Sequence, residues 1–255
     1  MTAPFIIAFA SLATSFLAGL ARHQRTASAL ISASGAALIA VFVLFVPLDS
    51  PIELAGLSIR IDSNWILLGR ALRLEPSVRP MIGYLYLYGL YMFSASWVME
   101  INRYFPAVAT LVLVTVAGSI MVDPFLFAAA FIGLAAMGSV LLLVSPQHPR
   151  SVGAVRIMVL YTFAMLSILL SGWMIETGSG TVIAPGGGTR AAIVLGFGFA
   201  ILMAIPPFHI WLTAAVQDAN AFVLAFITVV LQGAGFFSVL RFLDAYAWLR
   251  QDPIF

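Results

Sequence analysis

Apolar stretches long enough to cross a bilayer recur along the whole chain, with short polar segments between them. About 20 consecutive apolar residues are typical of a transmembrane helix. The pattern therefore predicts an all-α, multi-pass bundle of about eight membrane-spanning helices. The expected spans are residues 4–21, 27–47, 80–99, 104–122, 124–144, 155–175, 190–206 and 221–240.

The segment between the second and third spans has a different pattern. Residues 52–62 partly alternate apolar and polar positions around Gly56, which predicts a short extramembrane β-hairpin. Residues 65–74 carry Arg70 and Arg73, and we expect an amphipathic helix at the membrane surface there. Further along, Asp123 precedes a proline, which predicts that it caps the start of the fifth helix.

The seventh span contains an interruption that the other spans lack. Two adjacent prolines, Pro206 and Pro207, are followed by His209 and Trp211 within a membrane-grade apolar run. Proline removes a backbone donor, and a broken helix in lipid needs other groups to satisfy its freed carbonyls. Either the seventh helix is discontinuous, or the prolines end it at the membrane surface with His209 and Trp211 as interfacial anchors.

Composition narrows the function classes. The chain is 62% hydrophobic and 9% charged, with a mean hydropathy of +1.08, so a soluble domain is excluded. The absence of cysteine excludes disulfides, iron–sulfur ligation and thiolate zinc sites. The three histidines, His23, His148 and His209, fall in or near loops, so a haem-binding bundle is not expected. We predict no metal, cofactor or nucleic-acid partner, and a lipid bilayer as the surroundings.

An ion pathway would show as ionisable residues in the middle of a span, because burying them in lipid is costly. The spans offer almost none. The candidates for an ion path are His209 and Asp218, near the proline break, and the polar Gln232. Tyr84, Tyr88 and Tyr91 share one helix face and could line a polar path, although such a stripe more often reflects packing and interfacial anchoring.

The proline segment resembles a hallmark of antiporter-like membrane subunits, which occur in respiratory complex I, multisubunit cation/proton antiporters and membrane-bound hydrogenases. The matching residues are Pro207, Phe208, His209, Trp211 and Leu212. The resemblance implies that Pro206, Pro207, Phe208 and Trp211 shape a broken helix. It also implies two inverted five-helix repeats, of which this chain would supply the first. We therefore divide the chain into residues 1–79, a two-helix segment with the hairpin, and residues 80–255, the antiporter-like half-repeat.

The departures from the family pattern bear on mechanism. The resemblance implies a glutamate, a lysine and a lysine or histidine at positions that fall here on Ile132, Leu202 and Gly233. None of these can carry a proton. The family's acidic motif after the tryptophan and leucine reads Thr213-Ala-Ala-Val216.

Three hypotheses remain. The first is a mainly structural subunit of a multisubunit energy-converting complex in the cell (inner) membrane, not catalytic alone, with other integral membrane subunits as partners, one of them supplying the second repeat. The second is an ion or proton carrier with a non-standard path through His209 and Asp218. The third is an unrelated transporter or scaffold in which the motif is coincidental.

Overall fold

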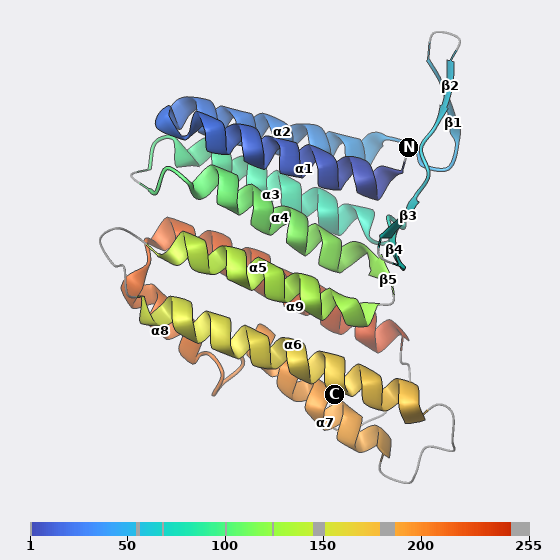
Figure 1. Cartoon of the computed structure of the whole chain (residues 1–255), viewed down its shortest axis with the longest axis vertical. Coiled ribbons are helices and arrows are strands. Elements are labelled where there is room, and N and C mark those ends of the chain that lie inside the picture. The colour runs from blue at the N-terminus through green and yellow to red at the C-terminus, as the bar shows by residue number, and fades with distance from the viewer. Residues whose placement is uncertain are drawn as a thin grey trace. The chain divides into compact units, whose positions relative to one another are not determined.

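The computed structural model describes residues 2–54, 57–67, 69–99, 101–123, 125–144, 151–178 and 187–245. This part of the chain is mostly helical (Figure 1). The α-helices are α1 (Ala3–Leu20), α2 (Arg25–Phe45), α3 (Arg79–Ser96), α4 (Phe105–Met121), α5 (Ala128–Leu143), α6 (Val152–Gly178), α7 (Gly187–Leu202), α8 (Ile210–Asp218) and α9 (Ala221–Ala245). Two short 3₁₀ turns are η1 (Ala21–His23) and η2 (Phe125–Phe127). The strands are β1 (Pro51–Leu54), β2 (Leu57–Arg60), β3 (Asn64–Leu67), β4 (Arg70–Arg73) and β5 (Val122–Asp123).

Four described helices are long and apolar enough to cross a membrane, judged by length and composition. They cover Ala3–His23, Arg25–Phe45, Val152–Ile175 and Ala221–Asp244. Three further apolar helices are shorter: Phe105–Met121, Ala128–Leu143 and Arg190–Leu202. The predicted helical membrane protein is supported at this level, whereas the count of eight spans stays a prediction.

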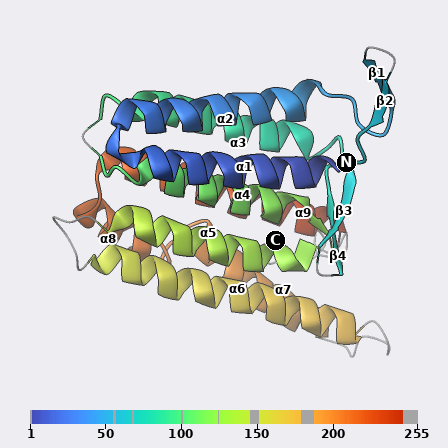
Figure 2. The ribbon, with the colours of Figure 1, turned by 45° about the horizontal axis from the view of Figure 1, so that its top comes forward.

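The chain forms two compact units, Met1–Pro124 and Phe125–Phe255. The predicted boundary at residue 80 marks the start of a proposed helix repeat, not of a compact unit. This division into units therefore does not test it. In the first unit, α1 to α4 lie side by side (Figures 1 and 2). A proline in the first turn starts α1, α3 and α4, where its missing N–H costs no helical hydrogen bond.

Small residues and buried hydroxyls hold the first unit together. Gly83 of α3 faces Leu44 of α2, and a Cβ at that glycine would lie 2.5 Å from the leucine Cδ2. The buried hydroxyls of Ser11 and Tyr86 lie 2.6 Å apart and form a hydrogen bond between α1 and α3. This is the packing expected of helices in lipid, where small residues allow close approach and polar groups pair across the interface.

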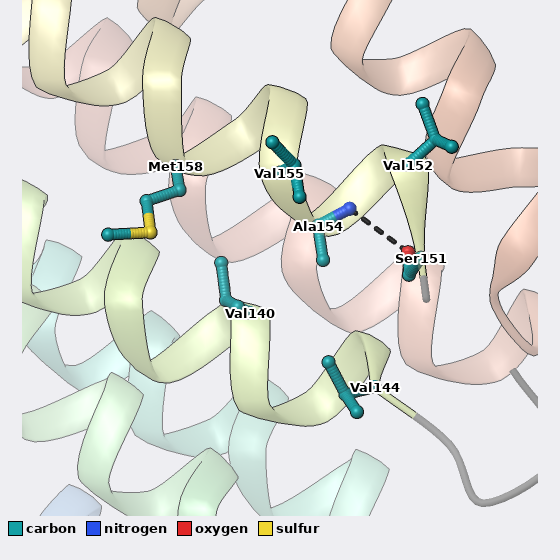
Figure 3. A pocket seen from close by; sticks show the side chains of 7 residues that line it. All are labelled: Val140, Val144, Ser151, Val152, Ala154, Val155 and Met158. Carbon is teal, nitrogen blue, oxygen red and sulfur yellow. Dashed lines mark hydrogen bonds between the residues drawn. The ribbon is translucent and has the colours of Figure 1, made fainter. Parts of the chain in front are cut away.

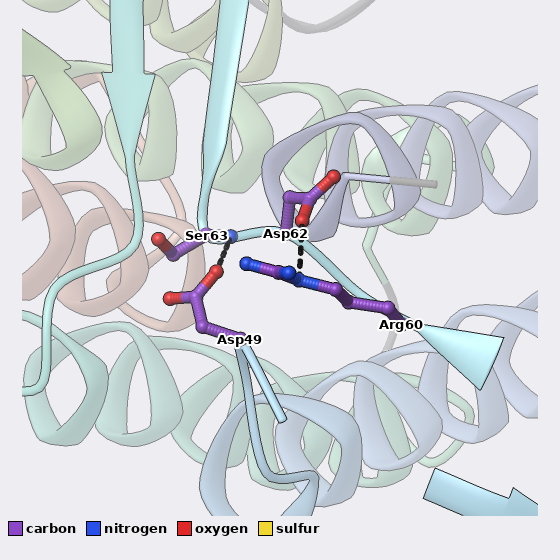
Figure 4. Close-up of polar contacts among 4 residues, drawn as sticks. All are labelled: Asp49, Arg60, Asp62 and Ser63. Carbon is purple, nitrogen blue, oxygen red and sulfur yellow. Dashed lines mark hydrogen bonds and ion pairs between the residues drawn. The ribbon is translucent and has the colours of Figure 1, made fainter. Parts of the chain in front are cut away.

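The predicted hairpin is confirmed. β1 and β2 pair antiparallel with Leu54 opposite Leu57, so the connection is only two residues long. Below the hairpin, the backbone N–H of Ser63 donates to the Asp49 carboxylate at 3.0 Å, and Arg60 lies 3.3 Å from Asp62 (Figure 4). Hydrogen bonds from the Ser63 side chain and backbone lower the pKa of Asp49 below its usual 3.8.

The amphipathic helix predicted for residues 65–74 is wrong, because this stretch forms the second hairpin. β3 and β4 pair antiparallel with Leu67 opposite Arg70. Gly69 in the connection has φ +75°, a conformation that two-residue hairpin turns require and glycine adopts without strain.

Asp123 is also placed differently from the prediction. It lies in β5, which pairs with β4, and its carboxylate is 3.2 Å from the Arg73 guanidinium. The residue before α5 is Phe127, at the end of η2, so Asp123 does not cap that helix. The aspartate closes a three-stranded sheet at one end of the first unit.

In the second unit, α6 is the longest described helix, with 27 residues. Glycines of α5, α6 and α9 lie in close contact with neighbouring elements. Gly172 faces Leu126 of η2, and Gly133 of α5 faces Met165 of α6. Gly235 of α9 lies against Leu202. Gly133 and Gly235 therefore serve close packing of these elements.

Candidate functional site

The helix interruption is positioned by α6, which runs beside both segments on either side of it. Gly198 of α7 faces α6 at Ile168, and a Cβ there would lie 2.9 Å from the isoleucine Cγ1. Gly153, near the start of α6, faces Ala215 of α8. Since early positions of α6 contact α8 and later ones contact α7, the two segments lie in line, antiparallel to α6 (Figure 1). The helix is therefore interrupted between Leu202 and Ile210 and then resumes, as the discontinuous-helix alternative predicts.

At the end of α7, backbone N–H groups of the following residues donate to carbonyls of the last turn. Ala204 has φ +55°, and its N–H donates to the Ile201 carbonyl at 3.1 Å. The N–H of Ile205 donates to the Ala200 carbonyl at 2.9 Å. This pair of bonds around a left-handed residue is a Schellman motif, with alanine at the position that glycine usually occupies.

The two other carbonyls of the last turn are also satisfied. The Phe199 carbonyl accepts from the Met203 N–H at 2.9 Å. The Leu202 carbonyl accepts from the Tyr161 hydroxyl of α6 at 3.3 Å, and Tyr161 is buried. The bond to Phe199 is the last regular bond of the helix, so the carbonyls without an intrahelical partner are those of residues 200–203. Three of these four, at Ala200, Ile201 and Leu202, are paired by protein groups.

The two prolines lie in an exposed turn that follows. The Phe208 N–H donates to the Ile205 carbonyl at 2.7 Å, which places Pro206 and Pro207 at the centre of a four-residue turn with a cis peptide bond between them. Both prolines are exposed. The ring of Phe208 packs edge-on against Phe197 of α7, with centroids 5.0 Å apart. The turn that separates α7 from α8 therefore contains Pro206, Pro207 and Phe208.

Trp211 fills the gap behind the turn. It is completely buried and packs edge-on against Tyr161, with ring centroids 5.6 Å apart. Its indole N–H has no hydrogen-bond partner among the described residues. The alternative in which Trp211 is an interfacial anchor is wrong, because no part of it is open to the surroundings.

Of the three ion-path candidates, His209 and Gln232 are not joined by a hydrogen bond within the described part of the chain. His209 is exposed at the end of the turn, where its backbone carbonyl accepts from Leu212 and Thr213. Gln232 is half-buried in the middle of α9, and within the described part of the chain no hydrogen bond links it to His209. Asp218 is the last residue of α8, and its side chain lies outside the described atoms.

The positions at which the family resemblance implies proton carriers are apolar and packed. Ile132 is 2% exposed and Leu202 is 1% exposed. Among the described residues there is also no group of three or more His, Asp or Glu side chains that could hold a metal ion. The arrangement therefore offers hydrogen bonds and aromatic packing at the break, without a chain of titratable groups.

Sequence reasoning missed Tyr161, which links α6 to the interrupted helix by both a hydrogen bond and a ring contact. The available signal was a hydroxyl in the middle of an apolar span, which in lipid requires a partner. It also missed Gly153, where the backbones of α6 and α8 come closest.

A separate apolar groove lies where α5 ends and α6 begins (Figure 3). Its volume is about 470 Å³, and it is lined by Val140, Val144, Ser151, Val152, Ala154, Val155 and Met158. The hydroxyl of Ser151 accepts a hydrogen bond from the Ala154 N–H at 3.0 Å, which caps the first turn of α6. The other six lining side chains are apolar.

Comparison with known proteins adds no family assignment. Protein-family models give no match, and the curated proteins give none either. The antiporter-like family therefore stays a prediction that rests on the residues around Pro207.

Proposed function

We propose that the chain is an integral membrane subunit of a multisubunit energy-converting complex, of the complex I-like or antiporter type, in which its role is mainly structural. The observation that carries the proposal is the closed helix break. The carbonyls of Ala200, Ile201 and Leu202 at the end of α7 are paired by protein groups, and Trp211 packs against Tyr161.

The physical argument starts from what a broken helix does in a membrane. Where it serves transport, its freed backbone groups bind ions or substrates at a cavity. Here Ala204, Ile205 and Tyr161 already donate to three of the carbonyls that would do so. The break then acts as a shaped joint that positions α8, and any ion translocation belongs to partner subunits.

The finer features of the proposal rest on the sequence pattern and the family resemblance. The chain crosses the cell (inner) membrane about eight times, the shorter apolar helices and α3 included. Residues 80–255 form one antiporter-like half-repeat, and another polypeptide supplies the second. That partner is permanent, because a lone half-repeat leaves an apolar interface exposed.

The first test is gentle purification of the tagged full chain from its native membrane, followed by mass spectrometry. We expect other antiporter-like and redox subunits in stoichiometric amounts. Recovery of the chain alone, or only with itself, would remove the support for a role in such a complex.

The second test separates a structural role from ion transport. We expect the purified complex carrying His209→Ala to pump ions at the wild-type rate in liposomes, because the His209 imidazole is exposed and makes no hydrogen bond among the described residues. Leu38→Ala, at an exposed apolar position of α2, is the control for reconstitution. Loss of flux with assembly intact in His209→Ala, but not in Leu38→Ala, would favour the carrier hypothesis.

A further inference from the structure

One helix of the first unit turns an unusual surface outward. Along α3 the exposed positions are Pro80, Tyr84, Leu87, Tyr91 and Ser94, and we call this set the α3 stripe. Tyr84 is 56% exposed, Leu87 47% and Tyr91 66%. The spacing alternates between four and three residues, which is the heptad spacing of helices that pack along one seam.

The neighbouring helices of this unit expose apolar side chains instead. On α1 and α2 the large exposed residues are Phe5, Phe9, Leu12, Phe16, Leu17, Leu20, Leu30, Leu38, Val41, Leu44 and Phe45. The α3 helix has 18 residues, yet it is not among the four helices that qualify as membrane spans. The helix is long enough to qualify, but with its tyrosines it is not apolar enough.

The α3 helix nevertheless shares the depth of α2. Gly83 packs against Leu44, and the Arg79 guanidinium donates to the Val43 and Val46 carbonyls at 2.7 and 2.6 Å. These contacts join the start of α3 to the end of α2, so the two helices run antiparallel (Figure 2). If α2 crosses the bilayer, as the proposed function requires, α3 crosses it too.

The two exposed tyrosines are too close together to be anchors at opposite membrane surfaces. Seven residues of helix rise about 10 Å, whereas the hydrocarbon core is about 30 Å thick. At least one hydroxyl therefore lies within the core, where an unpaired hydroxyl costs free energy. The inward-facing Tyr86 shows how this unit treats such a group, because its hydroxyl is paired with Ser11.

We propose that the α3 stripe is the contact surface for a second copy of this chain, in a parallel dimer about a two-fold axis. Two copies inserted in the same orientation bring α3 helices together in parallel. In such a pair with heptad spacing, each layer meets its own equivalent. Tyr84 then faces Tyr84 and Leu87 faces Leu87.

The chemistry of the α3 stripe suits a copy of itself. A hydroxyl is both donor and acceptor, so a row of tyrosines complements an identical row, which a row of like charges would not. Arg79 is the one ionisable group besides tyrosine in the described residues 79–99, and its guanidinium is bound to α2. The two copies therefore meet without charge repulsion.

The absence of cysteine makes the test direct. Leu87→Cys, at the centre of the α3 stripe, should form a disulfide-linked dimer when native membranes are oxidised. Leu38→Cys is the matched control, being 71% exposed on α2. It lies at nearly the same depth, because Leu44 faces Gly83 and the helices are antiparallel. Equal cross-linking of both variants, or none at Leu87→Cys, would overturn the proposal.

A second measurement tests the hydroxyls. Tyr84→Phe with Tyr91→Phe, in the Leu87→Cys chain, keeps the ring shapes and removes two hydroxyl layers. We expect about ten-fold weaker dimerisation when the protein is diluted in lipid vesicles, from the usual strength of interhelical hydrogen bonds in membranes. Unchanged dimerisation would overturn the role of the hydroxyls, and cross-linking of Leu87→Cys to a different polypeptide would overturn the second copy as the occupant. Copurification with redox subunits is a separate result, so each proposal can fail alone.

Discussion

Gly153 is the position at which a single methyl group should do most harm to the second unit. A Cβ at this residue would lie 2.6 Å from the Ala215 Cα, 2.8 Å from the Ala215 nitrogen and 3.0 Å from the Ala214 carbonyl carbon. All three are backbone atoms of α8, and a backbone cannot turn aside as a side chain can. Gly153→Ala therefore forces α6 and α8 apart.

The size of the effect follows from these distances. Carbon atoms pack favourably at about 3.5 Å or more, so the helices must separate by about 1 Å at this point. The displacement loosens the packing of Trp211 on Tyr161, because both residues belong to the same pair of helices. Overpacking of this kind costs about 1–3 kcal/mol, and about 2 kcal/mol lowers the Tm of a chain of this length by about 4–8 °C.

The measurement is thermal unfolding in mild detergent, followed by tryptophan fluorescence. Gly133→Ala is the matched control, since its Cβ would meet the Sδ of Met165 at 2.8 Å, and methionine readily takes another rotamer. Alanine also favours a helix over glycine by about 1 kcal/mol, so Gly133→Ala should leave the Tm unchanged or raise it. Equal Tm values for the two variants would show that α6 and α8 do not meet closely at Gly153.

Three further changes test other contacts. Tyr161→Phe should lower the free energy of unfolding by about 0.5–1.5 kcal/mol, measured by denaturant titration, because the Leu202 carbonyl loses its hydroxyl donor; unchanged stability would argue against this bond. Arg79→Gln should lower it by about 1.5–3 kcal/mol through the loss of charged donors to two α2 carbonyls, and a variant as stable as wild type would contradict that bridge. Because the pKa of Asp49 is lowered in the folded state, its stabilising effect is present above pH 3.8 and is lost as the pH falls through the folded pKa. The hydrogen-exchange protection factor of the Ser63 amide, which is corrected for the intrinsic pH dependence of exchange, should therefore fall in acid, and Asp49→Asn should remove this effect; the same acid response in both proteins would refute the assignment.

The sequence predicted the helical class and the first hairpin because both depend on local patterns. Apolar runs of about 20 residues and alternation around Gly56 are visible without tertiary contacts. The second hairpin was missed because residues 65–74 carry apolar and basic residues at spacings that suit an amphipathic helix as well as strands. Pairing with β5, from a distant part of the chain, favours the strands, and such pairing cannot be read from a local window.

The existence of the helix break could be predicted from the sequence, but its geometry could not. Two prolines in an apolar run indicate an interruption by the chemistry of proline alone. The resumption of the helix at Ile210, and its alignment beside α6, depend on Gly153 and Tyr161, which are distant in sequence. The Schellman motif at Ala204 gave no signal either, because glycine is the usual residue at that position.

The way in which the break is satisfied explains how one motif can fit more than one role. A broken helix in a bilayer must pair its carbonyls, and it can do so with water and ions or with protein donors. In this chain the donors are backbone N–H groups of the following turn and one tyrosine, while apolar Ile132 and Leu202 occupy two positions at which the family resemblance implies proton carriers. The bend in the chain then acts as a joint between helices and sets the position of α8.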